Sequence, residues 1–130
     1  MSNNIVLPPE IQQFMVRKKL QQVKALAAQG SPIHLNELGM MHAFGKGVPK
    51  DRAKAIALFE KAASMGFLMA LFNHANLLLG EQENPEDEVK AIELFNEAVN
   101  KGHLLSMNQL GYFYEHGLHG VQDLGKALEY

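Results

Sequence analysis

Six histidines are the side chains of this 130-residue chain that could most readily bind a metal ion or transfer a proton. His116 and His119 are three residues apart near the end of an expected helix, a spacing that can place two ligands on one ion. A zinc site needs three or four ligands, and only Glu115 stands obviously nearby. We therefore expect turn and cap roles for this pair and no metal site. Three further histidines are expected to pack in or beside the core: His34, His42 and His74.

Carboxylates gather in one stretch of the chain. General acid–base catalysis needs two such groups that converge in a pocket, whereas these residues are nearly contiguous, so we expect a flexible, solvated acidic loop. The alternative is an acidic patch that attracts a basic partner. The residues concerned are Glu81, Glu83, Glu86, Asp87 and Glu88.

Other catalytic signatures are missing from the sequence. Gly45-Lys46-Gly47 lacks the spacing of a phosphate-binding loop. We find no nucleophile–base motif and no dinucleotide fingerprint, and we therefore predict no enzyme activity, no catalytic residue and no cofactor.

The composition excludes several classes of partner. The net charge is −2, and the one basic cluster, Arg17, Lys18, Lys19 and Lys24, is more typical of a solvated helix face than of a nucleic-acid site. The chain has no cysteine, which rules out disulfides and thiolate metal sites. No segment approaches the roughly 18 apolar residues of a membrane span, and the N-terminus does not resemble a signal peptide. We expect a soluble cytoplasmic protein.

Self-similarity at a period of 36 residues decides the fold class. Gly30, Gly66 and Gly102 recur at this spacing. The same register holds for other positions: Asp51, Asp87 and Asp123; Lys54, Lys90 and Lys126; Ala55, Ala91 and Ala127; and Phe59 with Phe95. A period of this length is typical of a repeat protein in which each unit is one supersecondary element.

Each unit is predicted to contain two helices. The first helices span about 33–44, 68–79 and 104–116, and the second about 51–65 and 86–101. Asp51 is placed as an N-cap, while Gly66 and Gly102 close helices in the left-handed conformation. Gly39 and Gly111 leave room where the partner helix crosses. Because one unit cannot bury its apolar face alone, we predict an all-α, right-handed solenoid of antiparallel helix pairs.

These residues resemble the Sel1-like repeat family, a relative of the tetratricopeptide repeats. The resemblance rests on Leu38-Gly39, Gly45, Gly47-Val48, Asp51, Lys54-Ala55, Phe59, Ala62-Ala63 and Gly66, and on Leu110-Gly111, Tyr114, Gly117, Gly120-Val121, Asp123 and Lys126-Ala127. The chain departs from the family pattern at His42, at His74-Ala75 and in the stretch 81–84, where an acidic run replaces the glycine turn. That loop is therefore expected to be more flexible or to differ in shape.

The repeat register divides the chain into five parts. Residues 1–8 are expected to be disordered, and 9–30 form an N-terminal capping helix. Three repeats follow at 31–66, 67–102 and 103–130. The third stops about two turns into its second helix, so we expect a natural protein that continues beyond Tyr130, or an end that is exposed and able to pair with a second copy into a homodimer.

The resemblance implies a protein-binding scaffold whose concave groove is lined by the first helices. By analogy with tetratricopeptide repeats, the groove residues are Asn36, Met40, Ala43, Phe72, Asn76, Leu79, Asn108, Tyr112 and Glu115. Phe72 and Met40 could instead pack against a neighbouring helix. We expect a protein or peptide ligand, with no nucleic acid. The alternatives are a bacterial toxin-neutralising (immunity) or host-interaction protein of the same fold and, less favoured, a β-lactam hydrolase, a role linked to cysteine-rich relatives.

Overall fold

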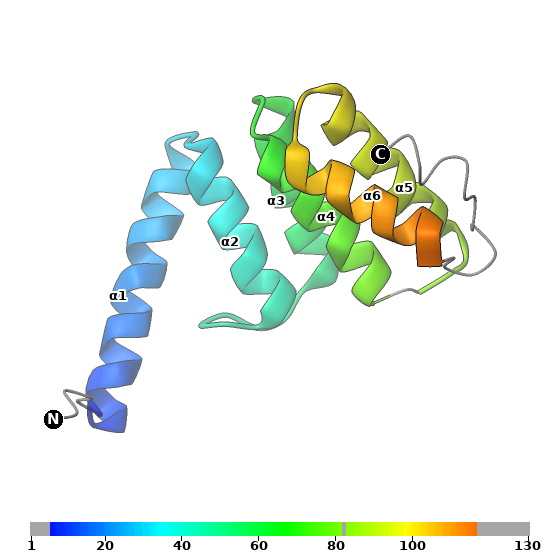
Figure 1. The fold of residues 1–130 in the computed structure, drawn as a ribbon. Coiled ribbons are helices and arrows are strands. Elements are labelled where there is room, and N and C mark those ends of the chain that lie inside the picture. The colour runs from blue at the N-terminus through cyan, green and yellow to red at the C-terminus, as the bar shows by residue number, and fades with distance from the viewer. Residues whose placement is uncertain (1–5, 82, 117–130) are drawn as a thin grey trace, which may run out of the picture.

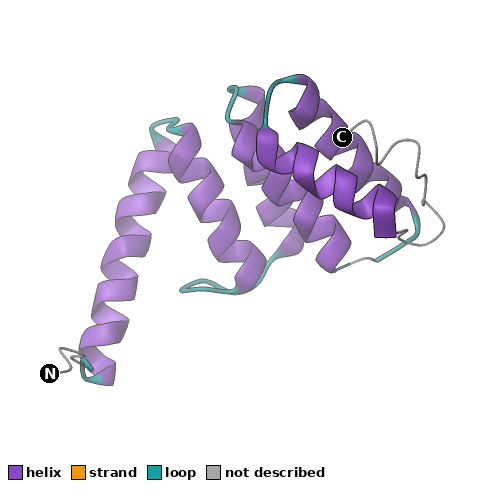
Figure 2. Ribbon diagram, viewed as in Figure 1, coloured by secondary structure: helices purple, strands orange, loops and turns teal. Residues whose placement is uncertain are grey.

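The computed structural model describes residues 6–81 and 83–116, which form six α-helices. Figure 1 shows them as α1 (Pro9–Ala28), α2 (Pro32–Phe44), α3 (Arg52–Ser64), α4 (Leu68–Gly80), α5 (Glu86–Asn100) and α6 (Leu104–His116). Within this part of the chain there is no strand (Figure 2). The prediction of an all-α solenoid is confirmed. The predicted repeat helices agree with α2 to α6 to within one residue at each end, whereas the capping helix expected over 9–30 ends two residues earlier, at Ala28.

The helices pack in chain order, each against the next. α2 lies against α3 and α4 against α5 as antiparallel pairs, whereas α1 meets α2 at one end and diverges from it at the other (Figure 1). The first helices α2 and α4 also contact each other directly. This stacking is the solenoid arrangement, in which each repeat buries its apolar face against its neighbours. The expected second helix of the third repeat lies outside the described residues.

One turn recurs after α1, α3 and α5. Gly30, Gly66 and Gly102 have φ values of 91°, 89° and 95°, the left-handed conformation that glycine adopts without strain. In each case the next residue donates a backbone hydrogen bond five residues back, as from Phe67 to Ala62 over 3.2 Å. This is the Schellman closure of a helix. The predicted role of Gly66 and Gly102 is therefore confirmed, and Gly30 has the same role after α1.

The core is built from small residues around two phenylalanines. Phe59 and Phe95 are fully buried, as are Ala55, Ala91 and Ala98. A Cβ added at Gly39 would lie 2.8 Å from Cε1 of Phe59, so α2 and α3 can cross at this distance only because Gly39 has no side chain. The expected close approach at Gly39 is confirmed. The partner helix expected for Gly111 lies outside the described residues.

Two of the N-terminal turns use a serine–histidine pair. Ser31 caps α2, and its Oγ lies 2.6 Å from Nδ1 of His34. Before α6 the pair is reversed, because Nδ1 of His103 accepts from the backbone N–H of Ser106 over 3.3 Å. Ser31 corresponds to His103 two repeats later, and His34 corresponds to Ser106, so the serine and the histidine have exchanged places. His34 is therefore the half-buried partner of the Ser31 cap, while His42 and His74 are buried as expected.

The acidic stretch differs from the expected solvated loop, and the prediction was wrong for 86–88. These residues form the first turn of α5, and Glu88 is buried. Asp87 is not an N-cap like Asp51 but lies inside the helix. Its carboxylate accepts from the Glu83 backbone N–H over 2.7 Å and from Arg52 of α3 over 3.0 Å. The Glu83 hydrogen bond, with help from Arg52, lowers the pKa of Asp87. The three acidic residues thus lie in the first turn of α5, where negative charge is favourable. The Asp87–Arg52 ion pair also connects two repeats.

Candidate protein-binding groove

The face formed by α2 and α4 contains a cleft with a volume of about 340 Å³, which we call the α2–α4 cleft. Three of the predicted groove residues, Met40, Ala43 and Asn76, meet there. Met40 and Asn76 occupy the same position in successive repeats, as do Phe44 and Gly80. The remaining lining residues are Phe44, Phe59, Asn73, Leu77, Gly80 and Glu81. The cleft therefore combines apolar side chains with two asparagine amides.

A hydrogen bond between amides crosses this face. Nδ2 of Asn73 on α4 donates to Oδ1 of Asn36 on α2 over 3.0 Å. Asn36 was a predicted groove residue, whereas Asn73 was not. Asn73 lies one position after the repeat equivalent of Asn36, and a pair that crosses between helices can be offset in this way. Both asparagines are visible in the sequence, but a comparison of residues 36 positions apart does not pair them.

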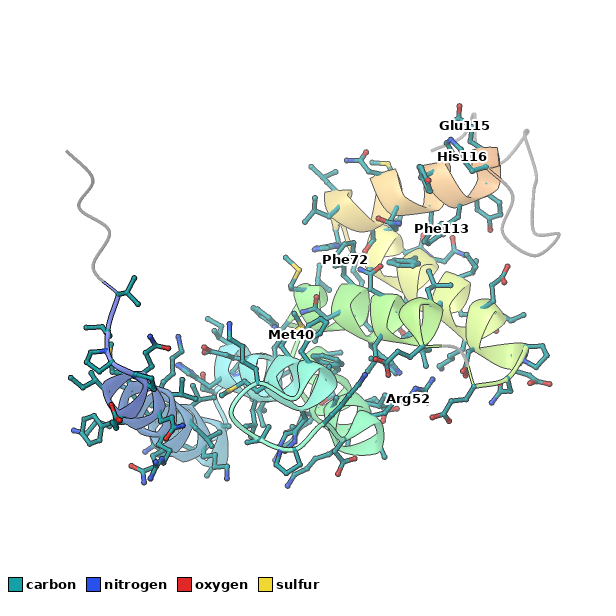
Figure 3. All side chains as sticks on the ribbon, turned by 90° about the horizontal axis from the view of Figure 1, so that it is seen from below. Met40, Arg52, Phe72, Phe113, Glu115 and His116 are labelled. Atoms are coloured by element: carbon teal, nitrogen blue, oxygen red, sulfur yellow. The ribbon has the colours of Figure 1, made fainter. Side chains whose placement is uncertain are left out.

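Phe72 and Leu79, also predicted for the groove, pack partly into the second core cluster. The Phe72 ring lies 5.8 Å from the Phe95 ring in an edge-to-face arrangement and 5.5 Å from the His103 ring. Such aromatic pairs stabilise packing beyond the area that they bury. Figure 3 places Phe72 between Met40 and Phe113 along the molecule. Phe72 is thus a half-buried packing residue.

The predicted groove residues of α6 are exposed. Asn108, Tyr112 and Glu115 all face solvent, and the Tyr112 side chain is 53% exposed. The Tyr112 ring stacks on His116 with the ring centres 4.1 Å apart, and Nδ1 of His116 lies 3.0 Å from the Tyr112 carbonyl oxygen. Figure 3 shows Glu115 and His116 together at the far end of this helix. Tyr112 therefore has a fixed orientation and a free face.

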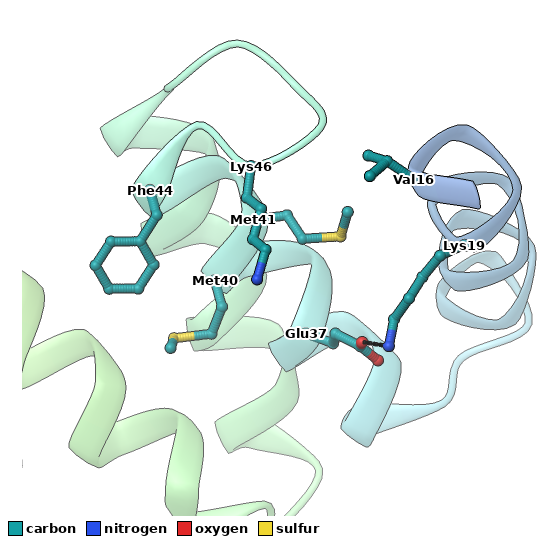
Figure 4. A pocket seen from close by; sticks show the side chains of 7 residues that line it. All are labelled: Val16, Lys19, Glu37, Met40, Met41, Phe44 and Lys46. Carbon is teal, nitrogen blue, oxygen red and sulfur yellow. Dashed lines mark ion pairs between the residues drawn. The ribbon is translucent and has the colours of Figure 1, made fainter. Parts of the chain in front are cut away.

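A second cavity lies between α1 and α2, with a volume of about 430 Å³; we call it the α1–α2 pocket. Figure 4 shows Met41 pointing toward Val16 across it, and Lys19 paired with Glu37. The full lining is Val16, Lys19, Glu37, Met40, Met41, Phe44 and Lys46. Sequence reasoning missed this pocket and the 71% exposed Phe44. Both depend on the angle at which α1 leaves α2, and the repeat pattern does not define that angle.

Among residues 6–81 and 83–116, no three histidine or acidic side chains are grouped closely enough to hold a metal ion. His119 lies outside this part of the chain. None of the described helices is both long and apolar enough to cross a bilayer.

Comparison with known proteins identifies the repeat. Residues 35–67, 68–103 and 104–130 each match the Sel1 repeat, so the match takes up most of the chain. No curated protein matches the chain.

Two solved structures share the fold. A Sel1 repeat protein from Oxalobacter formigenes is 27% identical with a TM-score of 0.73, over 88% of this chain and 46% of that one. The protective antigen c5321 of uropathogenic Escherichia coli, which displays an SLR fold, is 23% identical with a TM-score of 0.74, over 88% of this chain and 25% of that one. The chain therefore spans less than half the length of either protein.

Sel1 repeats generally mediate protein interactions. The three matched segments, the stacked helix pairs and the two similar structures agree. The chain belongs to the Sel1 repeat family.

Proposed function

We propose that this protein is a non-enzymatic scaffold that binds a protein or peptide in the groove formed by α2, α4 and α6. The observation that carries the proposal is the α2–α4 cleft, where Met40 and Asn76 from successive repeats line one open cavity. Functionally, we treat residues 9–30 as a cap and 31–66, 67–102 and 103–130 as the three repeats. We also propose the cytoplasm as the compartment, with which a chain without cysteine is compatible.

The chemistry of the cleft suits a peptide. An asparagine amide has both donors and an acceptor, so it can pair with a peptide backbone whatever its side chains are. Met40 is flexible and polarizable, and Phe44 is largely exposed, so together they offer an adaptable apolar contact. Tyr112 adds a large exposed ring that is already oriented by His116. Large side chains of this kind supply most of the free energy at protein interfaces.

The lining of both cavities supports a binding role over hydrolysis. Neither the α2–α4 cleft nor the α1–α2 pocket is lined by a serine or threonine that a base could activate. A nitrocefin turnover assay tests this part of the proposal, and turnover above background would contradict it. Toxin neutralisation and host interaction are two settings in which such a groove could act.

The experiment that tests the proposal is affinity capture of the partner from the source cells, followed by titration of the purified partner. Asn76→Ala and Tyr112→Ala should each weaken binding, while the chain stays folded. As a matched control, Ala57→Ser changes an exposed position of α3 and should leave the affinity unchanged. Equal affinity for all four proteins would place the binding surface elsewhere.

A further inference from the structure

The charges of this chain are distributed unequally between its N-terminal part and the rest of the described fold. Residues 9–50 carry six lysines or arginines and two acidic side chains, a net charge of +4. Residues 51–116 carry five basic and ten acidic side chains, a net charge of −5. The overall net charge of −2 therefore conceals a strongly basic N-terminal part. The field of this part favours acidic ligands.

The α1–α2 pocket lies within this basic part, and its walls are apolar. Val16, Met40, Met41 and Phe44 line it, and its volume of about 430 Å³ lies in the range of roughly 300–1,000 Å³ that is usual for ligand sites. The Val16 side chain is 42% exposed and Phe44 71% exposed. A bound apolar side chain would remove this surface from water, which is the main favourable contribution to such a contact.

The cations at the pocket differ in whether they have a partner. Lys19 lies 3.2 Å from Glu37, so these two charges offset each other. Lys46 extends from the turn after α2 along the pocket beside Met40 and Met41 (Figure 4). Among the described carboxylates, none lies within ion-pair distance of Lys46. Lys46 is thus the cation that remains available to an incoming carboxylate.

From this arrangement we infer that the α1–α2 pocket binds an apolar side chain of a partner segment whose neighbouring residues are acidic, with a carboxylate on Lys46. The inference rests on the proposed function, because the pocket shares Met40 and Phe44 with the α2–α4 cleft. It adds the chemistry of the partner: an apolar anchor flanked by glutamate or aspartate. The nearby Arg17 and Lys18 would attract the same segment over a longer range.

Methionine-methyl NMR tests the inference at the pocket itself. The probe is a 12-residue peptide with Leu-Phe at its centre and glutamate elsewhere, added to protein labelled on its methionine methyl groups. Met40 and Met41 should shift with saturation, while Met65 and Met107 on other parts of the fold stay unchanged. Lys46→Glu should weaken binding at least tenfold, and Lys54→Glu, an exposed position of α3 with the same charge change, should leave binding within twofold.

Three comparisons can overturn the inference. A peptide with lysine in place of glutamate, or with serine in place of Leu-Phe, should not shift Met40 and Met41; an equal shift from either contradicts the required charge or anchor. Oligothymidylate that shifts both methyl groups as strongly would show a simple cation patch. A shift that depends on protein concentration alone would assign the pocket to a second copy.

Failure here can be separated from failure of the proposed function. If the captured partner still depends on Asn76 and Tyr112 while the acidic peptide does not bind, the groove stands and only the acidic-anchor inference is lost. If the peptide binds but the partner ignores both groove variants, the proposed groove is wrong and the pocket remains.

Discussion

Asn73 and Asn36 are joined by a hydrogen bond of 3.0 Å between their side-chain amides, one on α4 and the other on α2. The bond connects the first helices of two repeats on the face that also carries the α2–α4 cleft. Each amide has further donor and acceptor capacity beyond this bond. The pair thus orients polar groups that a bound peptide backbone could use.

A double-mutant cycle on this pair measures its contribution. Asn36→Ala and Asn73→Ala should each lower the free energy of unfolding, and the two effects should not add. A coupling of about 0.5–1.5 kcal/mol is expected for one partly buried hydrogen bond. Urea unfolding of the four proteins gives this value. Additive effects would show that the two amides act independently in solution.

Gly39→Ala should destabilise the protein. The new Cβ would lie 2.8 Å from the ring of the buried Phe59 and 3.3 Å from the carbonyl oxygen of Ala55, so the ring and backbone have to shift. Overpacking of this kind, less the gain in helix propensity, should cost about 1–2 kcal/mol.

Gly80→Ala is the matched control for this change. Nothing lies within 4 Å of a Cβ placed at Gly80, so this substitution should be neutral or stabilise by up to about 1 kcal/mol. Chemical denaturation compares the two variants. Equal effects would mean that α2 and α3 do not cross as closely as described.

The pattern of the sequence predicts the helices and their caps well, because these depend on residues close together in the chain. Gly66 and Phe59 have roles that recur 36 residues later at Gly102 and Phe95, and Asp51 caps α3 through its own backbone neighbours. The sequence pattern predicts less well those contacts and cavities that depend on the angles between helices. Phe72 packs against Phe95 and His103, and the α1–α2 pocket was not anticipated. Asp87 differs from Asp51 because α5 begins earlier in the register than α3.

The buried His74 should make stability depend on pH. Burial lowers its pKa from the ordinary value of 6.5, and the nearby Lys90 and Arg52 add to this effect while Glu60 opposes it. The folded state therefore keeps His74 neutral where the unfolded state already binds a proton. The contribution of neutral His74 to the free energy of unfolding is fully present above about pH 6.5. It decreases as the pH falls from there toward the pKa of the folded state.

Thermal melting between pH 7.5 and pH 5 tests this dependence. His74→Leu places at this position the residue found at Leu38 and Leu110 of the other repeats. The wild-type melting temperature should fall more steeply with decreasing pH than that of the variant. Parallel pH profiles would show that another group is responsible.

Phe59→Ala and Tyr112→Ala separate packing from binding. The Phe59 ring is 1% exposed, so its loss leaves a cavity between repeats and should cost roughly 3–5 kcal/mol of stability. Tyr112 is 53% exposed, so its loss should cost less than about 1 kcal/mol of stability but weaken partner binding by about 1–3 kcal/mol. Thermal melting and partner titration measure both quantities. If the Tyr112 variant melts at the same reduced temperature as the Phe59 variant, Tyr112 is a packing residue.

If α2, α4 and α6 form the binding face, site-specific photo-crosslinking from these helices captures the bound partner. A photoreactive phenylalanine analogue is placed singly at Asn76 and Tyr112 on this face, and at the exposed Ala57 and Glu93 on α3 and α5. After irradiation in the source cells, mass spectrometry identifies the adducts. We expect one shared partner that crosslinks from positions 76 and 112 and not from 57 and 93. The same adduct from 57 and 93 alone would locate the binding face on α3 and α5 instead.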